Sequence, residues 1–268
     1  MRAETDVTIS GAYGAVLNAG GGATGLEIAV DGIDVVVRDL TLTGGTATKA
    51  VAAGGVGGGG ILCERAGGAT LTLEEVTITG NTTWAYGGGL YVDGCTVTME
   101  GGAITHNTAQ AGAGAFVIGV GAATVVNITG SEVASNTASL SGGGLYVMTG
   151  GKDATVDLVD TRVSGDTSMG GGGGLGLADG GVPDTSTRVT CTGGSFVGNV
   201  AEDAALPGGG VYLVSSWGNG VAFTSTGCDF GAAGTDEDNT PADTYVYGKS
   251  AYIYASGASF SCDGSGCR

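Results

Sequence analysis

The sequence has little proline, few basic residues and no long apolar run. Only 3 of its 268 residues are Pro, so its 58 glycines do not form a collagen-like repeat. The formal net charge of −17, with 9 Lys and Arg, disfavours nucleic acid and anionic membranes as partners. No apolar stretch could cross a bilayer, and none follows Met1, so we expect neither membrane insertion nor a signal peptide.

Cysteine is sparse but informative. Six are present, and the even number favours an oxidising compartment. Cys63 and Cys95 fall in consecutive copies of the repeat described below, and Cys228 with Cys262 or Cys267 stays open as a pair. No two cysteines have the CxxC spacing of a zinc site, and we expect no metal and no cofactor.

Two unlike signals alternate along the chain. The first is an apolar residue followed three positions later by Asn or Asp. The second is a glycine triplet, or a near copy, such as those at 87–89 and 142–144. Strict alternation of two signals indicates one structural unit copied many times, which is a solenoid. The Asn or Asp of the first signal occupies five positions: Asn81, Asn107, Asn136, Asp166 and Asn199.

One copy contains three short strands. From Gly87 to Gln110, three segments alternate between apolar and polar residues, and glycine-rich turns separate them. The predicted fold class is therefore all-β: a single right-handed parallel β-helix over residues 1–268, with three sheets and about seven to eight coils. We expect the Cys-rich segment 252–268 to cap the last coil, because an open sheet edge invites aggregation.

Alignment of the copies predicts columns of side chains along the solenoid. The Asn residues get a structural role, since an Asn side chain can bond to the backbone and to the Asn of the next coil, and Asp166 interrupts this series. The inward residues form two columns: Leu71, Val97, Val126, Val156, Val189 and Phe223, and Leu73, Met99, Ile128, Leu158, Cys191 and Ser225.

The repeat resembles that of a known group of surface proteins. Gly101-Gly102-Ala103-Ile104 and Phe196-Val197-Gly198-Asn199 are similar to the paired GGAI and FxxN repeats of polymorphic outer-membrane proteins and autotransporter-type passengers. The resemblance covers residues 26 to 230. It implies a secreted β-helical rod with an adhesive or scaffold role.

An aromatic stripe is the first candidate binding site. In most copies an aromatic residue occupies the outward position after the glycine triplet, which predicts a solvent-exposed ladder of rings. Such a ladder could bind a carbohydrate or a surface protein. The alternative is that the rings merely stack on each other. Gly176 interrupts this ladder, and the long turns 178–187, 199–207 and 231–243 are its expected walls. The predicted binding residues are Tyr91, Phe116, Tyr146, Tyr212 and Tyr245.

Catalysis is the main alternative, since many parallel β-helices are polysaccharide lyases or glycoside hydrolases. Glu74 and Glu100 align on adjacent coils, but a glycosidase needs two carboxylates in a cleft, and the lone His106 fits a solvated turn. We therefore name no catalytic residue and favour a non-enzymatic role. The acidic loop 235–239 lacks the spacing of a known calcium loop.

Regular T-x-T pairs such as Thr96/Thr98 raise ice binding as a further alternative, which Asn127, Asp157 and Arg188 disfavour by breaking the array. The sequence thus predicts an extracellular or cell-surface structural or adhesin-type protein that binds carbohydrate or a protein partner. It predicts no particular oligomeric state.

Overall fold

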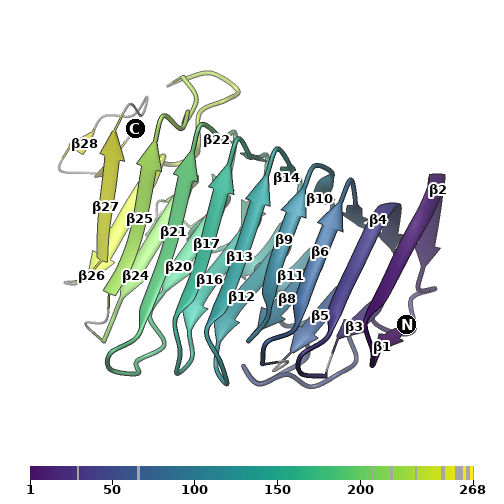
Figure 1. The fold of residues 1–268 in the computed structure, drawn as a ribbon. Coiled ribbons are helices and arrows are strands. Elements are labelled where there is room, and N and C mark those ends of the chain that lie inside the picture. The colour runs from purple at the N-terminus through teal and green to yellow at the C-terminus, as the bar shows by residue number, and fades with distance from the viewer. Residues whose placement is uncertain are drawn as a thin grey trace.

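The chain folds as stacked coils of β-strand. The computed structural model describes all residues except 29, 65–66, 204, 207, 218–219, 233, 249–250, 257–261, 264–265 and 268. Within the described part there is no helix, and the strands stack as about eight coils, from the N-terminal strand β2 to the C-terminal strand β27 (Figure 1). The predicted fold class is confirmed.

The first sheet has eleven strands. Neighbouring strands are parallel, except at the C-terminal end, where β29 runs antiparallel to both β26 and β28. In spatial order the strands are β1 (Arg2–Ala3), β3 (Leu26–Ile28), β5 (Ile61–Glu64), β8 (Leu90–Asp93), β12 (Ala115–Gly119), β16 (Leu145–Thr149), β20 (Leu175–Ala178), β24 (Val211–Ser215), β26 (Thr244–Gly248), β29 (Gly266–Cys267) and β28 (Cys262–Asp263).

The second sheet has fourteen strands and covers two sides of the solenoid, because β4 bends at Asp39 (φ 54°) and pairs with both sides. Its broad side contains β2 (Val7–Asn18), β4 (Asp34–Thr43), β6 (Thr70–Glu74), β9 (Thr96–Glu100), β13 (Thr124–Thr129), β17 (Ala154–Val159), β21 (Ser186–Thr192), β25 (Gly220–Thr226) and β27 (Ala251–Ser256). Its narrow side contains β7 (Thr77–Thr79), β10 (Ala103–Thr105), β14 (Glu132–Ala134), β18 (Arg162–Ser164) and β22 (Ser195–Val197).

A short third sheet of four strands closes the coil: β11 (Thr108–Ala111), β15 (Thr137–Ser141), β19 (Thr167–Ser168) and β23 (Val200–Ala201). At the C-terminal end β27 still pairs in parallel with β25, so the regular stack runs to Ser256. Much of the segment predicted as a cap lies beyond that point, outside the described residues.

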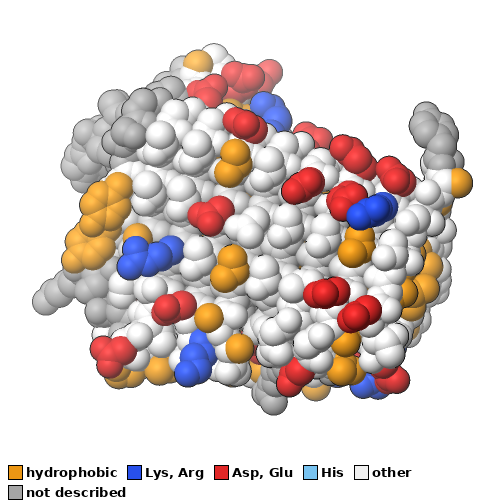
Figure 2. Space-filling view, in the orientation of Figure 1, with side chains coloured by type: hydrophobic (Ala, Val, Ile, Leu, Met, Phe, Trp, Pro, Cys, Tyr) orange, Lys and Arg blue, Asp and Glu red, His pale blue; other side chains and the backbone are white. Residues whose placement is uncertain are grey.

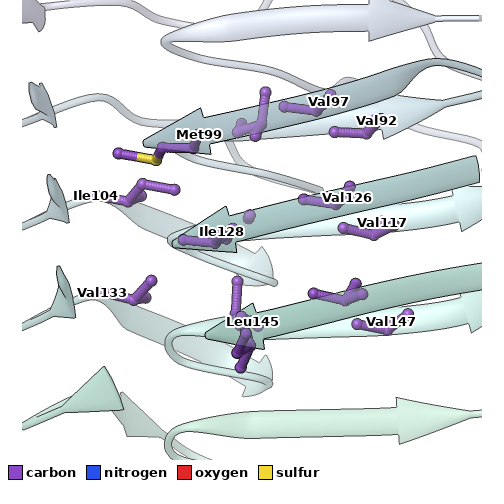
Figure 3. Close-up of a cluster of buried hydrophobic side chains, with 14 of the residues drawn as sticks. Val92, Val97, Met99, Ile104, Val117, Val126, Ile128, Val133, Leu145 and Val147 are labelled. Atoms are coloured by element: carbon purple, nitrogen blue, oxygen red, sulfur yellow. The ribbon is translucent and has the colours of Figure 1, made fainter. Parts of the chain in front are cut away.

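The interior is one continuous apolar core. Val126 of β13 points toward Val117 of β12, and Val97 toward Val92, so side chains of the first two sheets meet inside the solenoid (Figure 3). Both predicted inward columns are confirmed by strand register, which pairs each residue with its counterpart in the next coil.

Two disulfides connect neighbouring coils. Cys63 bonds to Cys95, and Cys191 bonds to Cys228. The pairing of Cys228 with Cys262 or Cys267, left open from the sequence, is therefore wrong. Cys191 and Cys228 lie in adjacent coils with their Cα atoms 6.3 Å apart, so Cys191 is close enough to bridge.

The predicted Asn residues form a buried hydrogen-bonded ladder. The backbone N and Nδ2 of Asn81 both donate to Oδ1 of Asn107, and those of Asn107 both donate to Oδ1 of Asn136, each at 3.0 Å. Asn199 donates in the same way to Asn239, a further ladder residue that the sequence pattern missed. The pattern failed there because an acidic turn, not an apolar residue, immediately precedes Asn239.

The ladder also explains why glycine triplets alternate with Asn. A Cβ placed on Gly89 would lie 2.6 Å from the carbonyl oxygen of Gly114 and 2.9 Å from Nδ2 of Asn107. The third glycine of each other triplet faces its own ladder residue equally closely. The glycine triplet and the Asn or Asp of the repeat therefore contact each other, and the ladder side chain fills the space that a Cβ on the third glycine would need.

Gly89→Ala is expected to lower the free energy of unfolding by about 2–3 kcal/mol, because the atoms in its way belong to backbone and to a buried ladder amide. Gly22→Ala is the matched control, since a Cβ at Gly22 would meet nothing within 4 Å. Urea unfolding of the two variants measures the difference. Equal stability of the two would contradict the contact.

Candidate functional site

The predicted aromatic stripe is a true column on the first sheet. Strand register places seven residues of consecutive coils side by side, and we call them the ring column: Leu62, Tyr91, Phe116, Tyr146, Gly176, Tyr212 and Tyr245. Parallel strands stack like residues because each coil repeats the register of the one before.

The rings of the column stack on one another. Tyr91 and Phe116 have centroids 5.6 Å apart with planes inclined by 6°, and Phe116 and Tyr146 are also 5.6 Å apart at 13°. Tyr212 and Tyr245 form a second stack at 5.9 Å. These distances lie in the range of favourable ring pairs. Mutual stacking of the rings, the structural alternative to binding, is therefore present.

The ring column is not the exposed stripe that the sequence predicted. Tyr91 is 0 % exposed, Phe116 1 % and Tyr212 7 %, so the expectation of solvent exposure is wrong for these three. Tyr146 and Tyr245 are half-buried. Tyr91 and Phe116 belong instead to a second apolar cluster, which lies outside the solenoid wall and includes Val51.

A loop of the N-terminal coil covers this end of the column. Residues 45–57, the covering loop, pack onto Tyr91, and a Cβ at Gly57 would lie 2.7 Å from the Tyr91 ring. An ion pair between Lys49 Nζ and Glu27 Oε1 (2.7 Å) ties the loop to the wall, and the backbone N of Ala52 donates to Glu64 Oε1 (2.8 Å).

The repeat pattern does not predict the covering loop, although the chain contains a signal for it. Gly45 occupies the ladder position of its coil, since its backbone N donates to Asn81 Oδ1. The connection from Gly45 to the glycine triplet at Gly58 is about twice as long as the connection from Asn81 to Gly87. The surplus residues form the loop.

An open groove lies where the covering loop ends. It has a volume of about 210 Å³, and the half-buried Tyr146 ring lines it above the buried Phe116 ring on which it stacks. No charged side chain lines it, so the surface that it offers is apolar and aromatic. The lining residues of this ring groove are Ala53, Tyr86, Ala111, Phe116, Ile118, Leu140, Tyr146 and Met148.

Tyr86 and Tyr146 bring phenol hydroxyls to the groove, and that of Tyr146 has a shifted pKa. Burial raises the pKa of its hydroxyl to about 12, and the charges that Tyr212, Tyr86 and Asp179 can carry act in the same direction. The phenol therefore stays protonated at physiological pH and can both donate and accept a hydrogen bond.

Gly176 does not leave a notch in the column. A Cβ there would lie 2.7 Å from Cδ2 of Tyr146, so the Tyr146 ring already covers this position. A larger residue at Gly176 would displace the ring that borders the groove.

The three long turns do not build one ridge. Turn 178–187 follows β20, turn 199–207 follows the ladder residue Asn199, and turn 231–243 leads into the ladder at Asn239. They lie at different corners of the coil. Asp236 and Glu237 of the last turn line a separate polar hollow of about 280 Å³ with Glu132 and Arg162. The three turns thus do not form the single continuous ridge that the sequence suggested, and the covering loop borders the N-terminal end of the ring column.

The carboxylates that the sequence raised as catalytic candidates lie on an outer face of the solenoid. Glu74 and Glu100 are neighbours in register, as predicted, but they lie on the outer face of β6 and β9, and Arg38 Nε contacts Glu74 Oε2 at 2.8 Å. This broad face carries scattered acidic and few basic side chains (Figure 2). His106 is an exposed corner residue with φ 55°.

Among the described residues, no three His, Cys, Asp or Glu side chains come together in an arrangement that could hold a metal ion. In the acidic loop, Asp238 Oδ2 accepts a hydrogen bond from the backbone N of Gly234 and so closes its own turn. That contact is typical of a structural turn.

Two features bear on the environment of the protein. The described part of the chain contains no helix with the length and apolar character needed to cross a membrane. The two disulfides are typical of proteins that fold under oxidising conditions.

Comparisons with protein-family models, curated proteins and solved structures find no match, so the chain is assigned by its architecture, as a parallel β-helix.

Proposed function

We propose that the chain is a secreted or cell-surface binding protein of the adhesin type, and that the ring groove receives the flat apolar face of a carbohydrate. The observation that carries this proposal is an open groove without charged side chains, lined by the half-buried Tyr146 ring and the exposed Leu140 side chain. Aromatic rings can bind the apolar C–H faces of sugars, and they offer a flat surface that such a face covers.

The charge of the chain narrows the ligand class. A net charge of −17 repels acidic polysaccharides, so we expect neutral glycans. The neutral Tyr146 hydroxyl then pairs with a sugar hydroxyl while the ring contacts the sugar face. The resemblance to outer-membrane and autotransporter-type repeats and the two disulfides support a surface location.

A glycan array followed by titration calorimetry tests the proposal. Tyr146→Ala is expected to weaken binding by about tenfold or more, because it removes the ring that borders the groove. Leu140→Ser should also weaken binding, and it leaves the ring stack intact because the Leu140 side chain is 54 % exposed. Tyr254→Ala is the control, since this ring is 58 % exposed and lies on β27 of the second sheet, whereas the groove lies on the first and third sheets.

Three outcomes would contradict the proposal. One is the absence of a neutral glycan that binds, and a second is equal binding by Leu140→Ser and Tyr254→Ala. The third is release of soluble sugars from a polysaccharide, which would favour a lyase or a glycoside hydrolase, the alternative function. Capture of a protein partner through the same groove would replace carbohydrate as the ligand.

A further inference from the structure

The ladder has one member of different chemistry. Asn136 and Asn199 show the regular arrangement. Their Oδ1 atoms accept hydrogen bonds from the ladder residue of the preceding coil, and their Nδ2 atoms donate to a backbone carbonyl of that coil. Asn136 Nδ2 donates to Ile104 O at 2.9 Å, and Asn199 Nδ2 donates to Val163 O at 3.0 Å. Nδ2 also donates to Oδ1 of the next ladder residue. Asp166, the exception, is fully buried.

One oxygen of Asp166 behaves as an Asn oxygen does. Its Oδ1 accepts from the backbone N of Asn136 at 2.8 Å and from Asn136 Nδ2 at 2.9 Å. The backbone N of Asp166 donates to Asn199 Oδ1 at 3.0 Å, as in the other rungs. The ladder thus continues through Asp166 without a change of register.

The other oxygen occupies the place of the Asn amide nitrogen. A Cβ on Gly144 would lie 2.7 Å from Asp166 Oδ2, just as one on Gly114 would lie 3.0 Å from Asn136 Nδ2. In that place the amide of an Asn member donates to a backbone carbonyl of the coil before and to Oδ1 of the next ladder residue, here Asn199. Asp166 Oδ2 is buried and has no hydrogen-bond partner among the described residues. Two oxygens can share a hydrogen bond there only if one of them carries a proton.

We propose that Asp166 is held as a neutral carboxylic acid whose Oδ2–H donates to Asn199 Oδ1, and that loss of this proton weakens the middle of the solenoid. A protonated acid donates one hydrogen bond and restores the ladder contact that an amide would make. A carboxylate would instead bury a charge and direct a second acceptor at Asn199 Oδ1, and both effects are unfavourable.

The electrostatic surroundings of Asp166 also favour its protonated form. Burial raises the pKa of Asp166 well above its usual value. The hydrogen bonds from Asn136 oppose this effect, and Glu132 on β14 adds to it. The other charged groups on this side are Arg162 on β18, and Asp236 and Glu237 on the turn above Gly198. Asn136, Asn199 and the glycines beside the ladder carry no charge.

The sign of the pH effect follows from proton binding. At low pH both folded and unfolded chains carry the proton, so Asp166 imposes no penalty. As pH rises above about 4, the unfolded chain releases its proton while the folded chain retains it. The unfolding equilibrium constant then grows about tenfold per pH unit, until the folded carboxyl ionises as well. The protein should therefore lose stability as pH rises.

The test compares the wild type with Asp166→Asn in urea unfolding at a series of pH values. The ratio of their unfolding constants should rise about tenfold per pH unit above about pH 4, with the Asn variant the more stable protein. Asp243, whose pKa burial raises to about 6, is present in both proteins, so its effect cancels in the ratio. Asp157→Asn, an outward-facing change on β17 of the same coil, should keep the wild-type profile.

Infrared spectroscopy supplies a readout that does not depend on reversible unfolding. The folded wild type at neutral pH should show the carbonyl band of a protonated carboxylic acid, and Asp166→Asn should lack it. Absence of that band, parallel pH profiles for the two proteins, or an Asn variant that is less stable at neutral pH would each overturn the proposal.

Discussion

Asn107→Ala is expected to lower the free energy of unfolding by about 4 kcal/mol. The Asn107 side chain takes part in four hydrogen bonds: Oδ1 accepts two from Asn81, and Nδ2 donates to Ile78 O and Asn136 Oδ1. Alanine removes all four and leaves buried polar groups on the two adjacent coils without these contacts, each at a cost of about 1–3 kcal/mol, part of which their other partners offset. Urea unfolding followed by circular dichroism measures the loss.

Asn127→Ala is the matched control for this prediction. Asn127 lies on β13 in the following coil, but its side chain points outward and is half-buried. Its replacement should change stability by no more than about 0.5 kcal/mol. If the two variants were equally stable, the ladder would not be a main source of stability.

Removal of the Cys63–Cys95 disulfide is expected to cost about 4 kcal/mol. The bond closes a chain segment with a sequence separation of 32 residues, and a crosslink of that span restricts the unfolded chain by about this amount. The variant is Cys63→Ala with Cys95→Ala, both buried positions. Chemical unfolding of the variant and of the wild type, each with and without reductant, measures the effect.

The second disulfide supplies the control. Cys191→Ala with Cys228→Ala removes a bond with a separation of 37 residues and should cost a similar amount. Because a solenoid coil contacts only its neighbours, hydrogen exchange should increase near the bond that is lost and little at the other end. Reactive thiols at Cys63 or Cys95 in the native wild type would contradict the pairing.

The features that the sequence predicted correctly all depend on stacking of one coil on the next. Val97 lies between Leu71 and Val126, and Asn107 lies between Asn81 and Asn136, because a parallel stack repeats its register in every coil. An alignment of repeats therefore identifies a column directly. The rule failed at Asn239, where a turn separates the ladder residue from the apolar Phe230 of its coil.

The sequence by itself determined the parallel β-helix, its inward columns and its Asn ladder, since these depend on local alternation and on the next coil. The tertiary structure alone decided that Tyr91 and Phe116 are buried, that the ring groove remains open beside them, and which cysteines bond. It also decided that Asp166 Oδ2 is buried beside Gly144 without a hydrogen-bond partner among the described residues. These features depend on the covering loop and on how the coils close around buried atoms, and no repeating pattern in the chain encodes such contacts.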